Sequence, residues 1–547
     1  MSGKVWKRSV RAVCGLAIVL LLGVTAKAQV QWSTLFTAQD VRDDLGTAAG
    51  RQEALGFCRR MGISKVYLET FRDGYQADRT TLEQARDYFR HTGLRVDGCV
   101  ATTDLGKPST GWKIVACYTN LQNREHLAEI FKYTASLFNE IIIDDFFFTD
   151  CECSECAAAK GSMSWEQYRR KLMLDVSRND VLAPARAVNP HVKIIIKFPQ
   201  WYDNFQQRGY TPDEEAALFD RIWVGTETRD PSMAQWGHTQ QYRGFFIYRW
   251  LHSIGGAKTG GGWFDPYGTD AALYMDQAWT TVLAGAPEVF LFHYGALTSP
   301  EFAAQADALE AAHQKLETLS KMVGGWQGIA AYKPVSSRPY DEPYIFDEIG
   351  MLGIPLLPTA KFPTGAPSAM FAEYALHDTN FVPELVQFLK AGKTAFLTAG
   401  LAHRLNLDPR LAAYSPLELP KGKLIEKIAA GPGKLVIFSD ALPKLAFVDS
   451  DNRVEQMTPE LRAALVELRR EAGNFTAVSL DAPPRVAIYP MKGRAAVMNY
   501  TELPVACHIE LGGMAGGRTQ IFAEGGAHLG AGGETLVMPP HSLIVVE

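Results

Sequence analysis

From residue 32 to residue 322, short apolar runs alternate with longer segments whose apolar residues recur every three or four positions. Short apolar runs predict buried strands, and the three-and-four spacing predicts amphipathic helices. This alternation is typical of strand–helix units that build a parallel sheet. The predicted strands are residues 32–36, 65–70, 94–101, 140–148, 192–198, 221–227, 260–265 and 289–294.

The number and spacing of these strands favour one architecture. Eight strand–helix units within roughly 290 residues match a (β/α)₈ barrel, the TIM barrel, in both number and length. An open doubly wound sheet is the alternative, but it rarely needs eight regularly spaced strands. We therefore predict an α/β chain whose catalytic barrel spans residues 29–325.

The pattern changes after the barrel. Residues 326–480 contain strand-and-turn segments at 344–359 and 393–400 and a helix at 382–393, which predict a second α/β domain of the flavodoxin or amidotransferase-like type. Residues 481–547 contain short strands separated by turns rich in Gly and Pro. Such a segment predicts a small C-terminal β-sandwich.

Residues 1–28 have the composition of a secretory signal peptide. Four basic residues precede an apolar run at 12–24, and Ala26-Lys27-Ala28 supplies the small residues of a cleavage site. A helix of that length rises roughly 20 Å, short of the roughly 30 Å hydrocarbon core, although an uncleaved membrane anchor is the alternative. We expect a periplasmic or extracellular protein without a membrane segment after cleavage.

Composition narrows the classes of partner. The formal net charge is −5 and the chain has no basic run, which argues against nucleic acid because phosphate neutralisation needs clustered Lys and Arg. Aromatic residues make up 11% of the chain, with many Trp and Tyr. That composition suits a surface that stacks on sugar rings.

Carboxylates stand at the carboxyl ends of several predicted strands, where barrel enzymes carry their reactive groups. Asp144 and Asp145 end the fourth strand between three isoleucines and three phenylalanines, Glu227 ends the sixth strand, and Asp265 ends the seventh. Glycosidic hydrolysis needs one acid to protonate the leaving oxygen and a second carboxylate as nucleophile or base. Consecutive strand residues face opposite ways, so we expect one aspartate of the pair to point into the barrel and the other toward the helices or loop.

Each carboxylate also has a purely structural interpretation. One aspartate of the pair could cap a loop while the other forms a salt bridge. Glu227 could belong to a surface ion pair, and Asp265 precedes a proline in a sequence that often forms turns. A charged pair enclosed by apolar residues would be an expensive structural device, which favours the functional interpretation of Asp144 and Asp145.

Further residues near the strand ends are candidates for substrate recognition. Trp263 and Tyr267 flank Asp265 and could form a platform for a sugar, and Arg229 is close enough to Glu227 to tune it. The predicted substrate-binding residues are Glu69, Lys197, Trp201, Tyr202, Arg229, Trp263, His293 and Tyr294.

Three cysteines follow the fourth strand in the pattern Cys151-x-Cys153-x-x-Cys156. Three thiolates at this spacing can wrap one tetrahedral ion, and Cys117 is the best-placed fourth donor. A disulfide within the cluster is the alternative in an oxidising compartment, but a bridge from Cys151 to Cys153 would be strained. We predict a structural zinc site, because four thiolates leave no open position for water.

These residues resemble glycoside hydrolase family 42, whose known members are β-galactosidases. In that family an Asn-Glu pair ends the fourth strand, where Asp144-Asp145 stands here, and a Cys-x-Cys-x-x-Cys zinc cluster follows, completed by an upstream cysteine that Cys117 matches. The middle region looks like that family's class I glutamine amidotransferase-like domain, and the last β region also corresponds. The resemblance implies oligomer contacts through the middle domain, whereas amidotransferase chemistry is not expected because no nucleophilic Cys follows its strand.

The chain departs from this family at the acids. The family's acid is a Glu, where Asp145 stands here, and its nucleophile ends strand seven, which nominates Asp265. The sequence itself favours Glu227, because that residue follows a regular strand and no proline commits it to a turn. Adjacent aspartates on strand four also resemble the substrate-assisted β-N-acetylhexosaminidases of family 84, in which one Asp orients the acetamide and the other is the acid. An Asp on strand four with an acid on strand six resembles the α-galactosidase clan, where the former is the nucleophile.

The residues therefore predict a secreted glycoside hydrolase that cleaves a poly- or oligosaccharide with paired carboxylates and retains the anomeric configuration. The alternatives are a substrate-assisted N-acetylhexosaminidase that uses Asp144 and Asp145, and a carbohydrate-binding barrel without catalysis. A zinc-dependent hydrolase is disfavoured, because the sequence has no H-E-x-x-H motif.

Overall fold

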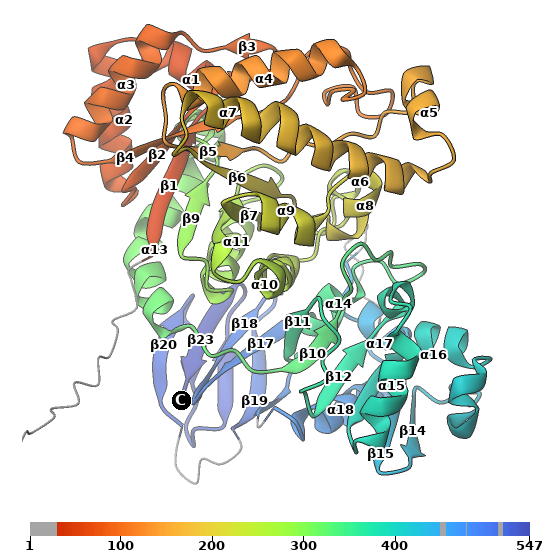
Figure 1. Cartoon of the computed structure of the whole chain (residues 1–547). Coiled ribbons are helices and arrows are strands. Elements are labelled where there is room, and N and C mark those ends of the chain that lie inside the picture. The colour runs from red at the N-terminus through yellow and green to blue at the C-terminus, as the bar shows by residue number, and fades with distance from the viewer. Residues whose placement is uncertain (1–29, 449–455, 477, 512–517) are drawn as a thin grey trace, which may run out of the picture.

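The computed structural model describes residues 30–448, 456–476, 478–511 and 518–547. The predicted signal peptide, residues 1–28, lies outside these ranges. In the described part of the chain, no helix combines the length and the apolar character needed to cross a bilayer. Figure 1 shows a barrel above two smaller units, a helix-covered sheet on one side and a pair of antiparallel sheets on the other.

The first unit is a closed barrel of eight parallel strands, as the sequence predicts. The first strand, β1, pairs with both β2 and β9, which closes the sheet, and the short strand β3 (Tyr75–Gln76) adds an antiparallel edge to β2. The barrel strands are β1 (Gln31–Phe36), β2 (Lys65–Arg72), β4 (Arg95–Val100), β5 (Glu140–Ile143), β6 (Lys193–Phe198), β7 (Arg221–Gly225), β8 (Thr259–Phe264) and β9 (Glu288–Leu291).

Helices surround this barrel and follow the three-and-four spacing of the sequence. Capping side chains begin several of them, such as Asp78 before α3 and Asn120 before α4. The main barrel helices are α2 (Ala48–Arg60), α3 (Arg79–His91), α4 (Leu121–Ala135), α6 (Trp165–Val176), α10 (Arg243–Gly255), α11 (Ala271–Leu283) and α13 (Ala303–Met322).

Each barrel strand contributes one side chain to a separate interior cluster. The barrel is therefore a packed core rather than a pore, and chemistry is confined to the loops at its carboxyl end. The cluster consists of Leu35, Tyr67, Cys99, Ile142, Ile195, Trp223, Trp263 and Phe290.

The middle unit is a six-stranded sheet in which all strands run parallel except β14. Its strand order is β11-β10-β12-β13-β15-β14. The elements are β10 (Ile329–Tyr332), α14 (Ile345–Met351), β11 (Leu356–Thr359), β12 (Ser368–Phe371), α15 (Phe381–Lys390), β13 (Thr394–Thr398), α16 (Ala399–Leu405), β14 (Ile425–Ala430), β15 (Gly433–Phe438) and α18 (Pro459–Gly473).

One predicted strand segment of this unit is partly wrong. The residues 344–359 contain the helix α14 as well as the strand β11. The helix forms because it packs on the barrel: the rings of Phe346 and Phe246 stack at 5.2 Å. Asp347 accepts hydrogen bonds from Arg243 at 2.7 Å and from Tyr202 at 2.8 Å, all three side chains being buried. These contacts join the two units tightly.

The last unit contains two four-stranded antiparallel sheets that share one apolar core, as predicted for a sandwich. Its first strand begins at Val478. The sheets contain β16 (Val478–Asp481), β19 (Val505–Leu511), β22 (Thr535–Met538) and β21 (His528–Leu529), and β17 (Val486–Met491), β18 (Arg494–Asn499), β23 (Ser542–Val546) and β20 (Gln520–Glu524).

Candidate active site

A cavity of about 730 Å³ opens at the carboxyl ends of the barrel strands. Barrel enzymes carry their active sites at this end, in the loops that follow the strands. The cavity collects most of the residues that the sequence nominates: Asp144, Asp145, Lys197, Trp201, Glu227, Arg229, Trp263, Asp265 and His293.

Lys197, at the end of β6, lies at the centre of the acidic groups. Its Nζ is 2.7 Å from Glu227 Oε1, 3.0 Å from Asp145 Oδ2 and 3.6 Å from Asp144 Oδ1. Its side chain is only 2% exposed, and the ammonium lies 4.1 Å from the centre of the Trp263 ring. Burial alone would lower the pKa of Lys197, but the three carboxylates outweigh it and raise that pKa, so the lysine stays charged.

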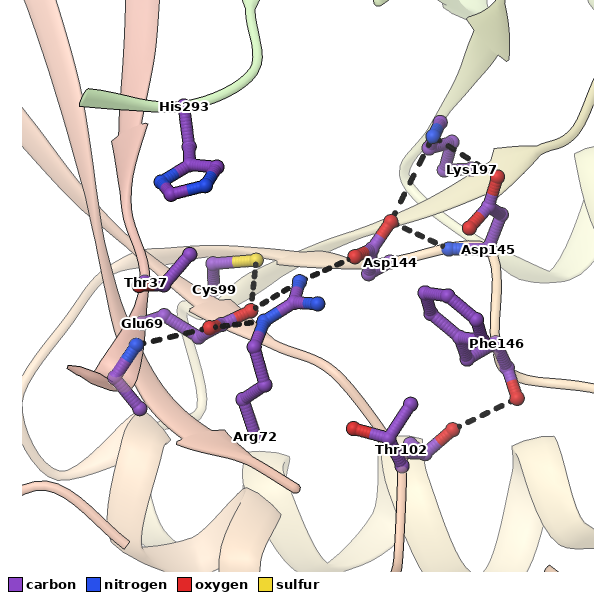
Figure 2. A network of polar contacts seen from close by, with 12 residues as sticks. Thr37, Glu69, Arg72, Cys99, Thr102, Asp144, Asp145, Phe146, Lys197 and His293 are labelled. Carbon is purple, nitrogen blue, oxygen red and sulfur yellow. Dashed lines mark hydrogen bonds and ion pairs between the residues drawn. The ribbon is translucent and has the colours of Figure 1, made fainter. Parts of the chain in front are cut away.

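Asp144 and Asp145 do not face opposite ways, which corrects the expectation from strand alternation. The strand β5 ends at Ile143, one residue before the pair, so alternation no longer applies there. Both carboxylates turn toward Lys197, as Figure 2 shows. The structure thus brings the two acids to one cation.

The two neighbouring aspartates titrate in opposite directions. Burial raises the pKa of Asp144, but Lys197 and Arg72 outweigh it, so the pKa of Asp144 falls below its ordinary value. For Asp145, burial is the largest cause, and the nearby carboxylates of Asp144 and Glu227 add to it. Together they overcome Lys197 and raise the pKa of Asp145 to about 7. Two carboxyl groups whose pKa values are pushed apart in this way can supply an ionised carboxylate and a proton donor side by side.

Arg72 is a second buried cation, and Glu69 holds it in place. The guanidinium is 2.5 Å from Asp144 Oδ2, and it also donates to both oxygens of Glu69, at 2.7 and 3.0 Å (Figure 2). Glu69 also accepts from the backbone N–H of Ala38 at 3.0 Å and from the thiol of Cys99 at 3.6 Å. Glu69 is fully buried and does not line the cavity, so its predicted contact with substrate is corrected to a role in orienting Arg72.

Glu227, just after β7, is the carboxylate closest to Lys197. Its Oε1 accepts from the ammonium, whereas its Oε2 has no hydrogen-bond partner among the residues that the structure describes. Burial raises the pKa of Glu227, Lys197 opposes this, and Asp265 adds to it. The side chain folds back over Gly225, where a Cβ would lie 2.2 Å from Oε2. A glycine at 225 is therefore required for this position of the carboxylate.

Asp265 occupies a different environment. Its Oδ2 accepts from Arg229 at 2.8 Å, and its Oδ1 accepts from the backbone N–H of Tyr267 at 3.0 Å. The second contact is the local turn that the Asp-Pro sequence indicates. The adjacent His293 bonds through Nδ1 to Asp40 at 2.7 Å and through Nε2 to the hydroxyl of Tyr267 at 3.2 Å.

The chain matches a family model described as "Probable glycosyl hydrolase, catalytic domain" over residues 22–327. This match spans more than half of the chain and all eight barrel strands. The protein belongs to this glycosyl hydrolase family. The matched region contains the barrel that carries Asp144, Asp145, Glu227 and Asp265.

Two solved glycosidase structures have a similar fold over nearly the whole chain. Gan42B, a GH42 β-galactosidase from G. stearothermophilus, is similar with a TM-score of 0.61 and 12% identity, over 95% of this chain and 98% of that one. The α-L-fucosidase isoenzyme 2 from Paenibacillus thiaminolyticus gives a TM-score of 0.60 and 10% identity, over 95% and 100%. At such identities the likeness shows the fold, and it extends over barrel, middle unit and sandwich.

A curated relative is an uncharacterized protein of Saccharolobus solfataricus. It is 28% identical over 335 residues, which are 54% of this chain and 55% of the relative. The chain thus spans about half the length of this relative.

Three of the predicted substrate-binding residues do not offer an open surface in the cavity. Two of them lie outside it, and the third is buried beneath it. Tyr202 is fully buried against Asp347 of the middle unit, outside the cavity. Tyr294 packs between Phe36 and Phe57, also outside it. Trp263 lines the floor of the cavity but is 1% exposed and stacks on Phe290 at 3.9 Å, so it supports Lys197 rather than offering an open face to a sugar.

Several residues of the cavity were not predicted from the sequence. Arg72 lies two residues beyond the predicted end of its strand, and Asp40 belongs to a short helix that begins at the capping residue Thr37. Trp112 and Trp236 lie in long loops, for which strand positions give no information. Their one sequence signal is a charged or aromatic residue in a loop after a strand, and many other residues of the chain share it.

The four predicted zinc ligands come together beside this site. The sulfur atoms of Cys117, Cys151, Cys153 and Cys156 all lie within 4.8 Å of one another, and the three pairs among Cys117, Cys153 and Cys156 are 3.6–3.8 Å apart. All four are free thiols. The cluster connects the loop after β4, which carries Cys117, to the loop after β5.

The close approach of Glu227 to Gly225 gives a direct test. In Gly225→Ala the new methyl group displaces the Glu227 carboxylate from Lys197, so we expect kcat to fall by about 10²-fold, as a misplaced catalytic group can cause. Hydrolysis rates and a thermal melt measure the effect and the fold. Gly365→Ala is the matched control, because its Cβ would meet no atom within 4 Å. Normal kcat in Gly225→Ala would contradict the importance of this carboxylate position.

Proposed function

We propose that this chain is a secreted retaining glycosidase in which Asp145 is the general acid and base and Glu227 is the nucleophile. The observation that carries the proposal is the sharing of one lysine: Asp145 and Glu227 each contact Lys197 Nζ, at 3.0 and 2.7 Å.

The shared ammonium limits the separation of the two carboxylates. Oxygens that both lie within 3.0 Å of one nitrogen are less than about 6 Å apart. Retaining glycosidases hold their carboxyl groups about 5–5.5 Å apart, whereas inverting enzymes need about 6.5–9.5 Å to admit a water molecule. This arrangement supports retention.

The electrostatics support the two roles. Asp145, with its pKa raised to about 7, can donate a proton to the glycosidic oxygen near neutral pH. Glu227 attacks the anomeric carbon as the leaving group departs, which forms a glycosyl ester. Water then cleaves this ester while Asp145 takes up its proton, so both carboxyl groups return to their initial states. Lys197 stabilises Glu227 as the carboxylate between turnovers.

The contacts of Asp144 and Asp265 support the roles of acid and nucleophile less well. Asp144 is bonded to Arg72 and the backbone N–H of Asp145, and lies near Lys197, which favours a positioning role over orientation of a substrate acetamide. Asp265 is held by Arg229 and by its own turn. It remains the second choice for the nucleophile, because it lines the same cavity and follows strand seven of the barrel.

A panel of aryl glycosides tests the activity. The nitrophenyl β-D-galactoside, α-L-fucoside and N-acetyl-β-D-glucosaminide represent the neighbours' named activities and the substrate-assisted alternative. We expect at least one to be cleaved, and Asp145→Asn to lower kcat/KM by about 10²-fold or more, the usual loss for a general acid. Binding of sugars without cleavage of any glycoside would instead support a carbohydrate-binding barrel.

Chemical rescue distinguishes the nucleophiles. Azide added to Glu227→Ala fills the space of the lost carboxylate and attacks the anomeric carbon, so we expect a glycosyl azide of inverted configuration. Mass spectrometry and NMR identify that product. Asp265→Ala is the matched variant. Glycosyl azide formed by Asp265→Ala alone would assign the nucleophile to strand seven and reject Glu227.

We also propose that Cys117, Cys151, Cys153 and Cys156 hold a structural zinc ion. Four sulfurs at about 2.3 Å from a tetrahedral zinc lie about 3.8 Å from one another, close to the separations of 3.6–3.8 Å between three of the pairs. A disulfide would need sulfur atoms about 2.05 Å apart. When bound, the ion would join the loops after β4 and β5 and supply no open position for chemistry.

Metal analysis checks this site. We expect about one zinc ion per purified chain, lost in Cys153→Ser and Cys156→Ser together with thermal stability, because ligand binding free energy adds to folding free energy. Cys507→Ala, which removes a buried thiol of the sandwich, should keep its zinc. Absence of zinc from the native protein, or disulfides among the four cysteines, would reject the site.

We also propose that the chain is exported and forms a homo-oligomer. The basic and apolar N-terminal segment with its Ala-x-Ala site supports export to the periplasm or the extracellular space. The resemblance of the middle unit to an amidotransferase-like domain supports a homo-oligomer through that unit.

A further inference from the structure

Two exposed tryptophans flank the catalytic cavity. Among the tryptophans that the structure describes, Trp112 and Trp236 are the exposed ones, at 46% and 38%, and both line the cavity that contains the acids. Large apolar side chains left open to water at a binding cavity usually mark contact with a ligand. Phe146, Trp201, Tyr267 and Phe292 also line the cavity but are half-buried, so the two exposed tryptophans offer its most accessible aromatic faces.

Trp112 is fixed beside the acid pair. Its backbone N–H donates to both oxygens of Asp150, at 3.1 and 3.0 Å, which ties the loop after β4 to the loop after β5. Its ring lies 5.7 Å from the ring of Phe146 and 5.8 Å from that of Phe148. Phe146 directly follows Asp145, and the indole lines the same cavity as the proposed acid.

Trp236 is fixed near Asp265, through Arg229 and a glycine. Its Nε1 would lie 2.5 Å from a Cβ at Gly268, so the ring packs closely on a glycine in the loop after β8. The guanidinium of Arg229 lies 4.9 Å from the centre of the Trp236 ring, and the same guanidinium binds Asp265. The two loops are also joined by a hydrogen bond of 2.8 Å from the Asp230 N–H to the Gly268 carbonyl.

The two rings come from separate sides of the barrel mouth. Trp112 follows β4, the third barrel strand, and Trp236 follows β7, the sixth. Strands three and six are far apart around a closed barrel of eight, with the acids of β5 and β7 lining the same cavity. The cavity, at about 730 Å³, falls in the range of roughly 300–1,000 Å³ that is typical of pockets for drug-sized ligands.

We infer that Trp112 and Trp236 are stacking platforms for sugar units on either side of the bond that is cleaved, so that the substrate is an oligosaccharide or polysaccharide. This inference rests on the proposed function, because it takes Asp145 and Glu227 as the point of cleavage. A sugar ring presents apolar C–H groups on its faces and hydroxyls at its rim, which suits an indole face surrounded by charged side chains.

The test compares two substrates of the same sugar. A glycosyl fluoride occupies only the site of the reacting ring, whereas a tetrasaccharide also needs the flanking sites. The sugar is the one cleaved in the panel of galactoside, fucoside and N-acetylglucosaminide. We expect Trp112→Ala and Trp236→Ala each to lower the ratio of kcat/KM for tetrasaccharide to that for fluoride by about tenfold, the loss typical of removing one aromatic anchor.

Tyr340→Ala is the matched control. Tyr340 is 47% exposed and does not line the catalytic cavity, so this variant should leave the ratio unchanged. An unchanged ratio in both tryptophan variants would overturn the inference. This holds also if activity on both substrates falls equally, because the rings would then act on the reacting sugar or on folding.

A binding measurement keeps this test separate from the test of catalysis. The Asp145→Asn variant is run in native gels that contain arabinogalactan, xyloglucan or glycol chitin, three neutral polysaccharides. We expect at least one of them to retard the protein, and the retardation to disappear when Trp112→Ala and Trp236→Ala are added. Retardation that survives both changes, or no retardation by any of the three, would overturn the platforms even if every aryl glycoside is cleaved. Loss of retardation with no cleavage by the native enzyme would support the platforms and reject the proposed catalysis.

Discussion

The contact of one buried ammonium with three carboxylates is the interaction on which the candidate active site depends. Removing a carboxylate from water costs roughly several kcal/mol, and three together repel one another. Lys197 offsets this cost, since its Nζ lies within 3.6 Å of Asp144, Asp145 and Glu227. Arg72 supplies the second cation and binds Asp144. The unequal distribution of the two cations leaves Asp145 as the member of the pair that most readily holds a proton.

The barrel makes that arrangement possible. Asp144 and Asp145 follow β5, Lys197 ends β6, and Glu227 follows β7, so neighbouring parallel strands deliver all four groups to one edge. Below them, the interior cluster fills the barrel, and Trp263 supports the lysine from beneath. Separate contacts hold the flanking loops. The cysteine cluster joins the loops after β4 and β5, and the hydrogen bond from the Asp230 N–H to the Gly268 carbonyl joins the loops after β7 and β8.

Much of this organisation could be predicted from the sequence. The eight strands were predictable because buried parallel strands are continuous apolar runs, such as the three isoleucines before Asp144. The segment 344–359 was predicted as strand although it begins with a helix, because a buried helix and a buried strand have similar composition. Contact with Phe246 of the barrel selects the helix at α14.

The site was predictable only where side chains end a strand. Lys197 and Glu227 fit that rule, but Glu69 turns inward to Arg72, and Tyr202 binds Asp347 of another unit, contacts that strand periodicity cannot reveal. Trp112 and Trp236 depend on loop conformations that are fixed by distant partners, Asp150 and Gly268. Such positions follow from the tertiary structure and not from local pattern.

The pH dependence of kcat/KM in the native enzyme, Lys197→Gln and Lys197→Arg tests the central claim most directly. Asp145 must be protonated to act as the acid, so activity of the native enzyme should fall as the pH rises through about 7. The ammonium of Lys197 lowers the pKa of Asp145, so in Lys197→Gln this alkaline limb should move to higher pH, and Lys197→Arg, which keeps the positive charge, should leave it near the native position. An alkaline limb that stays in place in a folded Lys197→Gln protein would contradict the assignment of Asp145 as the acid under the control of Lys197.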